Sequence, residues 1–126
     1  EGNSVFKLDI RGNRLQRIAG TGEKGYSGDG GSAMDATFNG PKGIAYSRSD
    51  NSLYIVDTEN HVIRKMSLAT GLIETVLGTG ERGDGPDGNP LLCKLNRPHG
   101  VCVDIGVVYV TDSENHRVRA ISRLSV

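Results

Sequence analysis

The chain repeats one pattern of polar and apolar residues, and this repetition limits its fold more than any other feature. LYIVDTENHVIRKM (residues 53–66) aligns without gaps on VYVTDSENHRVRAI (residues 108–121), 55 residues further along. Upstream, FNGPKGIA (38–45) aligns on LNRPHGVC (95–102) at a spacing of 57. A period of this length is typical of architectures in which similar units pack against their neighbours.

A third repeated segment, GTGEKG, matches the glycine pattern of a dinucleotide-binding loop. The pattern occurs twice, as GTGEKG at 20–25 and as GTGERG at 78–83. A cofactor loop opens a helix, yet both copies are followed by residues rich in Gly, and Gly costs about 1 kcal/mol per position in a helix. We therefore expect no cofactor here, and we interpret the glycines as the exit from a strand, where positive φ angles are needed.

The rest of the chain predicts short strands. Runs rich in Val, Ile, Leu or Tyr are bounded by Gly, Asn or Asp. They form a pair, a group of four and a group of three, and the short loops within each group predict antiparallel meanders. The expected strands cover residues 4–10 and 14–20; then 43–47, 52–58, 61–68 and 72–78; and finally 100–104, 107–112 and 116–122.

The motifs LYIVDTENHVIRK and VYVTDSENHRVRA, with the N-x-P-x-G segments that begin at Asn39 and Asn96, resemble NHL repeats. That family is named for an Asn-His-Leu signature, whose third position here holds Val62 or Arg117. The resemblance implies an all-β fold, a β-propeller of usually six blades, each a four-stranded antiparallel meander with strands A to D running outwards from a central channel. Residues 1–126 would then be a propeller fragment with an incomplete ring: 4–20 as strands C and D of one blade, 43–78 as a complete blade, and 100–122 as strands A to C of the next.

A set of polar residues recurs in both aligned motifs. In each copy an aspartate ends strand B, an Asn-His pair turns into strand C, and an arginine lies on strand C. We expect a polar clasp that fixes this hairpin, with each aspartate paired to the arginine or the histidine of its own blade. A catalytic centre would need the set only once, so catalysis is not expected from it. The predicted structural residues are Asp57, Asn60, His61, Arg64, Asp112, Asn115, His116 and Arg119.

Residues that differ between the repeats are better candidates for function. Lys42 and His99 occupy one slot, immediately before the first strand of a group, and Arg97 also breaks the repeat. On the propeller template these three residues form a channel rim that faces solvent or a partner. A related peptide-amidating lyase carries metal in such a channel, but only one of the two slots is histidine here, so we expect no metal.

Further expectations concern burial. The segments SAMDATF and PLLCKL should place apolar side chains between blades, and both cysteines, Cys93 and Cys102, should be buried free thiols. The apolar side chains in question are Ala33, Ala36, Phe38, Leu91, Leu92 and Leu95.

Charge and composition exclude several classes of partner. Lys and Arg number 15, as do Asp and Glu, without a long run of either sign, so nothing indicates binding to nucleic acid or to an anionic membrane. No apolar run approaches 18 residues, and the first ten residues lack the pattern of a signal peptide. The compartment stays open, although such repeats are common in bacterial extracytoplasmic proteins.

Two blades cannot close a propeller, so we expect either the remainder of a longer propeller or self-association. Three copies would give six blades, with strand 14–20 of one chain completing the last blade of another; residues 4–10 and 116–122 would then compete for one position. The predicted function is a non-catalytic scaffold or binding module with itself or another protein as partner. The alternative is a metal-dependent propeller enzyme, lyase-like or lactonase-like, which would need His, Asp or Glu at matched positions around the channel.

Overall fold

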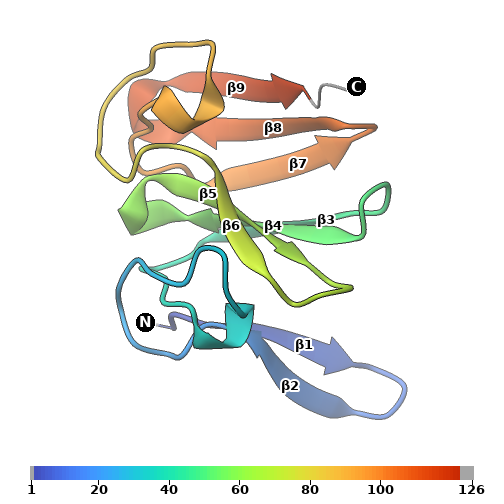
Figure 1. Cartoon of the computed structure of the whole chain (residues 1–126). Coiled ribbons are helices and arrows are strands. Elements are labelled where there is room, and N and C mark those ends of the chain that lie inside the picture. Colours follow the sequence, from blue (N-terminus) through green and yellow to red (C-terminus); the bar gives the residue numbers. More distant parts are fainter. Residues whose placement is uncertain (1, 123–126) are drawn as a thin grey trace.

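The structure, a computed structural model, describes residues 2–122 and contains three antiparallel sheets (Figure 1). Each strand lies inside its predicted range. Single turns of 3-10 helix, η1 to η4, connect some of them at Ala33–Asp35, Thr58–Asn60, Pro90–Leu92 and Ser113–Asn115. The first sheet is β1 (Val5–Asp9) and β2 (Arg14–Ala19); the second is β3 (Gly43–Ser47), β4 (Ser52–Asp57), β5 (Val62–Ser67) and β6 (Ile73–Leu77); the third is β7 (Gly100–Asp104), β8 (Val107–Asp112) and β9 (Arg117–Ser122).

The three sheets stack on one another as successive blades (Figure 1). Their first strands, β3 and β7, lie against each other. Gly43 permits this approach, because a Cβ there would lie 2.6 Å from the carbonyl oxygen of His99. The fold is therefore all-β, made of β-propeller blades in an incomplete ring, as predicted.

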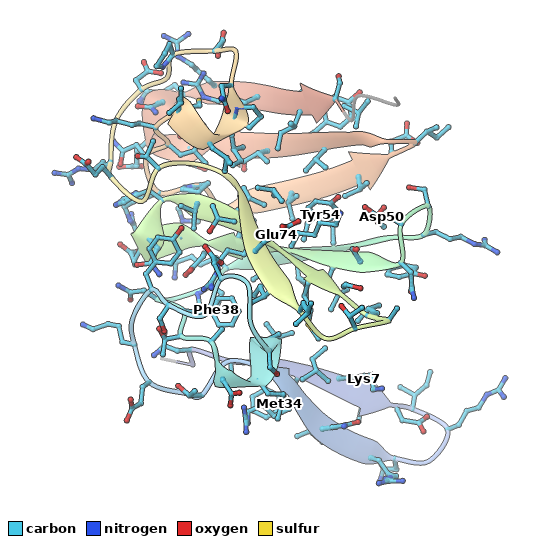
Figure 2. The ribbon with its side chains drawn as sticks, viewed as in Figure 1. Lys7, Met34, Phe38, Asp50, Tyr54 and Glu74 are labelled. Atoms are coloured by element: carbon cyan, nitrogen blue, oxygen red, sulfur yellow. The ribbon has the colours of Figure 1, made fainter. Side chains whose placement is uncertain are left out.

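Two apolar clusters hold the stack together, and β4 contributes to both. Ile55 faces the first sheet, whereas Tyr54 and Val56 face the third, as the alternation of side chains along a strand requires. Phe38 lies between the first and second sheets (Figure 2). The buried members between the first and second sheets are Ala19, Ala33, Ala36, Phe38, Ile55, Met66 and Ile73; those between the second and third are Tyr54, Val56, Ile63, Leu77, Cys93, Leu95, Val108 and Val110.

Two of the burial predictions for the PLLCKL segment are wrong. Leu91 and Leu92 are 51% and 64% exposed, because they stand at the positions of Met34 and Asp35, which also face solvent. The residue that takes the buried place of Ala36 is Cys93.

The prediction of two buried thiols is wrong for Cys102. That residue lies on β7, on the face of the third sheet that has no neighbouring sheet, and it is exposed. Ala33, Ala36, Phe38 and Leu95 are fully buried as predicted.

Long crossovers leave β2 and β6 through Gly20 (φ 85°) and Gly78 (φ 106°), so the repeated glycines do form strand exits. Side chains would not fit there: a Cβ at Gly78 would lie 2.5 Å from the carbonyl oxygen of His61. In the described part of the chain, no helix has the length and apolar character needed to cross a membrane.

Candidate functional site

Asp57 is the centre of the polar clasp in the second sheet. It ends β4 and is fully buried. Its Oδ1 accepts the backbone N–H of Asn39 at 2.8 Å, while Oδ2 accepts Nδ2 of Asn60 at 2.9 Å and lies 3.4 Å from Nη1 of Arg64. Burial raises the pKa of Asp57, and these three donors oppose that rise. The carboxylate therefore ties the turn between β4 and β5 to the crossover that carries Asn39.

Arg64 extends the same clasp further into the crossover. Its side chain is fully buried, and its Nη atoms donate to the carbonyl oxygens of Thr37 and Ser27, both at 2.7 Å. Nη2 also lies 3.1 Å from Oδ1 of Asp29, and the guanidinium stacks 4.8 Å from the centre of the Phe38 ring. The clasp thus holds a long loop onto the sheet as well as fixing one hairpin.

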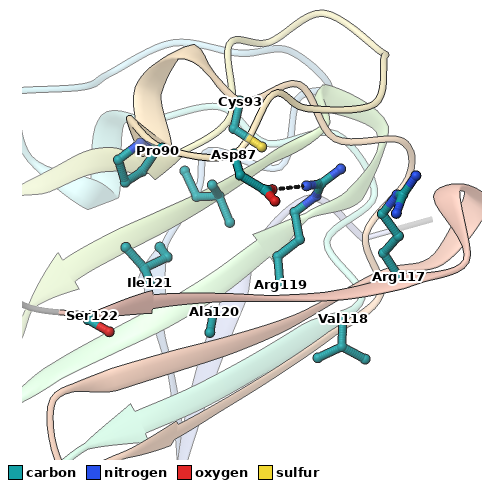
Figure 3. A pocket seen from close by; sticks show the side chains of 11 residues that line it. Asp87, Pro90, Cys93, Arg117, Val118, Arg119, Ala120, Ile121 and Ser122 are labelled. Carbon is teal, nitrogen blue, oxygen red and sulfur yellow. Dashed lines mark hydrogen bonds and ion pairs between the residues drawn. The ribbon is translucent and has the colours of Figure 1, made fainter.

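The third sheet repeats the clasp in a more open form. Buried Asp112 accepts the N–H of Asn96 and Nδ2 of Asn115, both at 2.8 Å, and Nε of Arg119 at 2.9 Å. Arg119 also pairs with Asp84 and Asp87, and the latter pair is visible in Figure 3. The Asp87 side chain is 91% exposed, so water reaches this side of the clasp.

The two histidines of the motif do not pair with the aspartates. His61 and His116 end the 3-10 turns in the left-handed region, at φ 58° and 56°. Nδ1 of His61 accepts the backbone N–H of Arg97 at 3.0 Å, which connects the second sheet to the residues that lead into the third. Because this contact requires an unprotonated Nδ1, the neutral imidazole suits the site, and burial lowers the pKa of His61 in the same direction.

Asn3 makes the equivalent contact one sheet earlier. Its Oδ1 accepts the backbone N–H of Gly40 at 2.8 Å, and Gly40 aligns with Arg97. In both places a side-chain acceptor immediately before a strand, β1 or β5, binds the segment that leads into the next sheet. Sequence reasoning missed this role, although the position of Asn3 before β1 and of His61 before β5 was available as a signal. His116 holds the third such position and is exposed.

The proposed rim residues Lys42, Arg97 and His99 lie next to the β3 and β7 strands. Arg97 forms a two-point ion pair with Glu59, with Nη2–Oε2 at 2.8 Å and Nε–Oε2 at 3.0 Å, and this pairing lowers the pKa of Glu59. Nδ1 of His99 lies 2.9 Å from the carbonyl oxygen of Arg97, and the backbone N–H of Lys42 donates to Val56. The structure therefore brings Arg97 and His99 together but binds Arg97 to the second sheet.

A groove of about 690 Å³ lies beside β9 (Figure 3). One wall is β9 itself, from Arg117 to Ser122, and the other is the crossover at Asp87, Gly88 and Pro90. Cys93 lies in this groove, where burial raises the pKa of its thiol. Among residues 2–122, no three His, Cys, Asp or Glu side chains come together as metal ligands would.

Comparison with known families gives two matches. The teneurin NHL domain matches residues 9–96, and the NHL repeat matches residues 95–121. Among curated relatives, the chain is 34% identical over 108 residues to the chloroplastic protein SUPPRESSOR OF QUENCHING 1 of Arabidopsis thaliana, covering 82% of this chain and 10% of that protein. It is 24% identical over 129 residues to NHL repeat-containing protein 2 of Gallus gallus, covering 96% of this chain and 18% of that protein.

Solved structures show the same fold. A protein of unknown function from Bacteroides thetaiotaomicron superposes with a TM-score of 0.83 at 24% identity, over 94% of this chain and 29% of the other. An auxiliary nutrient binding protein from the same organism superposes with a TM-score of 0.71 at 22% identity, over 93% and 31%. A third, provisionally named a phosphatase, gives 0.71 at 20% identity, over 96% and 30%. The chain therefore spans less than a third of the length of each of these proteins.

Proposed function

The chain belongs to the NHL-repeat family, and we propose that it is a non-catalytic scaffold and binding module that associates with further blades through the two ends of its stack. In a protein made of these 126 residues, those further blades would come from other copies. In a longer protein they would come from the same polypeptide.

The observation that carries this proposal is the exposure of apolar residues at both ends. Ile63 and Tyr54 face the third sheet and are 0% and 4% exposed, while their equivalents on the outer face of the third sheet, Val118 and Tyr109, are 70% and 43% exposed. These two end residues have the same chemistry as their buried counterparts, but no neighbouring sheet covers them within residues 2–122.

The opposite end shows the same difference. Met66 and Ile73 face the first sheet and are 6% and 1% exposed, whereas Leu8 and Leu15, their equivalents on the first sheet, are 56% and 68% exposed. The face with Val118 corresponds to the one that the second sheet presents to the third, and the face with Leu8 to the one it presents to the first. Joining the two ends head to tail into one shared blade would bury both Val118 and Leu15.

The number of blades favours a closed ring of three copies. Each chain would supply two blades once the third sheet received a fourth strand, and a six-bladed propeller needs three such chains. Closure matters because an open head-to-tail series continues into filaments, whereas a ring leaves no apolar end exposed.

Two features support a binding role over a catalytic one. The recurring Asp, Asn and Arg side chains are engaged in holding crossovers onto sheets, as the contacts of Asp57 and Asp112 show. Arg97, the most distinctive rim residue, is paired with Glu59. The name of the auxiliary nutrient binding protein also indicates ligand binding on this fold, while the phosphatase name of another neighbour is the reason to test hydrolase activity directly.

The test is sedimentation velocity over a range of protein concentrations. We expect the chain to associate, and Val118→Asp to prevent association by placing a charge on the end face. Ile105→Asp is the matched control, since Ile105 is 91% exposed on the β7–β8 turn rather than on the sheet face. A folded wild-type chain that remains monomeric throughout, or a Val118→Asp variant that associates normally, would contradict the proposal.

A further inference from the structure

We propose that β1 is displaced when chains associate. In the assembled form, β9 of one chain replaces β1 as the strand paired with β2 of another chain, and that β2 fills the groove beside β9. The inference rests on the self-association proposed above and identifies the strands that make its contact.

The first and second sheets show that β1 stands in the position of a third blade strand. The hairpins β1–β2 and β5–β6 have the same register: Phe6 pairs with Arg17 as Arg64 pairs with Thr75, and both hairpins have a bulge one residue earlier. After each hairpin the chain continues as GTGE followed by Lys or Arg. β2 is therefore the counterpart of β6, and β1 is the counterpart of both β5 and β9.

The second sheet shows which strand occupies the position that is an open groove beside β9 in the third sheet. There, β6 is hydrogen-bonded on one side to β5 and on the other to the crossover: Gly30 N–H donates to the oxygen of Ile73 at 2.7 Å, and Ile73 N–H to the oxygen of Gly31 at 3.0 Å. In the third sheet the same two walls, the edge of β9 and the crossover around Gly88, enclose the open groove (Figure 3). An extended strand fits between them.

Charge favours β2 as the strand that enters. In the second sheet, Thr75 of β6 donates to Asp29 Oδ2 at 2.6 Å. Asp87, which pairs with Arg119 as Asp29 pairs with Arg64, is 91% exposed and would meet the residue at the Thr75 position. In β2 that residue is Arg17, whose guanidinium donates to the carbonyl oxygens of Gly20 and Met34 and would lie beside the Asp87 carboxylate in the groove.

β1 is a poorer partner for β2 than β9 would be. It carries Phe6, 56% exposed, where the other two strands carry the clasp arginine. A two-stranded hairpin is also marginally stable by itself. His116 could replace Asn3 as the acceptor of the Gly40 N–H, because His116 precedes β9 as Asn3 precedes β1 and His61 already accepts such an N–H.

The experiment locks β1 onto β2 with a reversible disulfide. Lys7 and Gln16 lie opposite each other, so Lys7→Cys with Gln16→Cys joins the strands, in a background of Cys93→Ala and Cys102→Ser. The matched control joins the equivalent pair in the second sheet, Lys65→Cys with Glu74→Cys, where the strands stay paired in either state. Lys7 and Glu74 are labelled in Figure 2.

We expect the oxidised Lys7–Gln16 variant to associate at least about tenfold more weakly than its reduced form, and the control to associate equally in both forms. If the oxidised Lys7–Gln16 variant associates as well as its reduced form, β1 displacement is wrong while self-association through the end faces stands. If the background protein itself stays monomeric although it is folded, both proposals fail. An equal loss of association in the oxidised control would also overturn the inference, because a disulfide would then weaken association even where it does not hold β1 on β2.

Discussion

Replacement of Arg64 by Ala tests the idea that the clasp is what holds the crossover on its sheet. Arg64 is fully buried and contacts Asp57, Thr37 and Ser27. The Arg64→Ala variant would keep the buried Asp57 carboxylate without its cation and remove the Arg64 donor from two carbonyl oxygens, of which that of Ser27 keeps the N–H of Thr37. Removing one partner of a buried ion pair costs about 3–5 kcal/mol, which is a large part of the roughly 5–15 kcal/mol of a typical domain.

The equivalent change in the third sheet should cost less. After Arg119→Ala, Asp112 keeps the N–H of Asn96 and the amide of Asn115, and water can solvate the exposed Asp87. We expect a loss of about 1.5–3 kcal/mol, the range for a hydrogen bond to a charged group. The two variants remove the same residue type, but Arg64 is fully buried and also binds two backbone carbonyl oxygens, whereas Arg119 is partly exposed and also binds exposed carboxylates.

The assay is urea unfolding followed by circular dichroism, at one low protein concentration because association would add stability. Arg11→Ala, on the exposed β1–β2 turn, serves as the control and should change the free energy of unfolding by less than about 0.5 kcal/mol. The reasoning is refuted if Arg64→Ala loses less than about 1 kcal/mol, or if Arg119→Ala loses as much as Arg64→Ala.

Other predictions concern pH, backbone conformation and thiol access. Because burial lowers the pKa of His61 below its usual 6.5, its contribution to stability is fully present above that value and is lost as pH falls through the folded-state pKa. Urea midpoints at pH 7.5 and 5.5 should therefore differ less in His61→Asn than in the wild type, and an unchanged difference would contradict this role. Gly78→Ala should lower the thermal midpoint more than Gly71→Ala: both have positive φ, but only Gly78 has backbone atoms within 3.0 Å of the added Cβ. Equal shifts would show that close approach does not matter. A thiol reagent should modify exposed Cys102 in the native protein before buried Cys93, and association should slow the reaction of Cys102. Mass spectrometry after a short pulse measures the order of modification, and faster modification of Cys93 would contradict the prediction.

Sequence repetition was enough to predict the strands, because each repeat carries its own alternation and turn residues. It also located the clasp residues, since Asp57, Arg64 and their copies recur at fixed spacing. It did not predict that the clasp reaches the crossover, because the acceptors of Arg64 are backbone oxygens, which leave no mark in the residue pattern. Contacts between sheets were missed because their donors are backbone N–H groups, as the hydrogen bond from Arg97 N–H to His61 shows, although the acceptor positions were visible in the sequence.

Burial in the PLLCKL segment was mispredicted because apolar character was taken as the guide instead of alignment. Leu91 and Leu92 are apolar yet occupy exposed positions, while Cys93 fills the small buried position of Ala36. Cys102 was mispredicted because its burial depends on a neighbouring sheet, which a reading of single residues does not supply.

The most direct test of the account is the molar mass of the native chain, measured by light scattering during size-exclusion chromatography at several loading concentrations. The account predicts a species of about three times the 13.4 kDa chain mass, which forms as concentration rises and does not grow further. A chain that unfolds cooperatively yet elutes as a monomer at every concentration would contradict it.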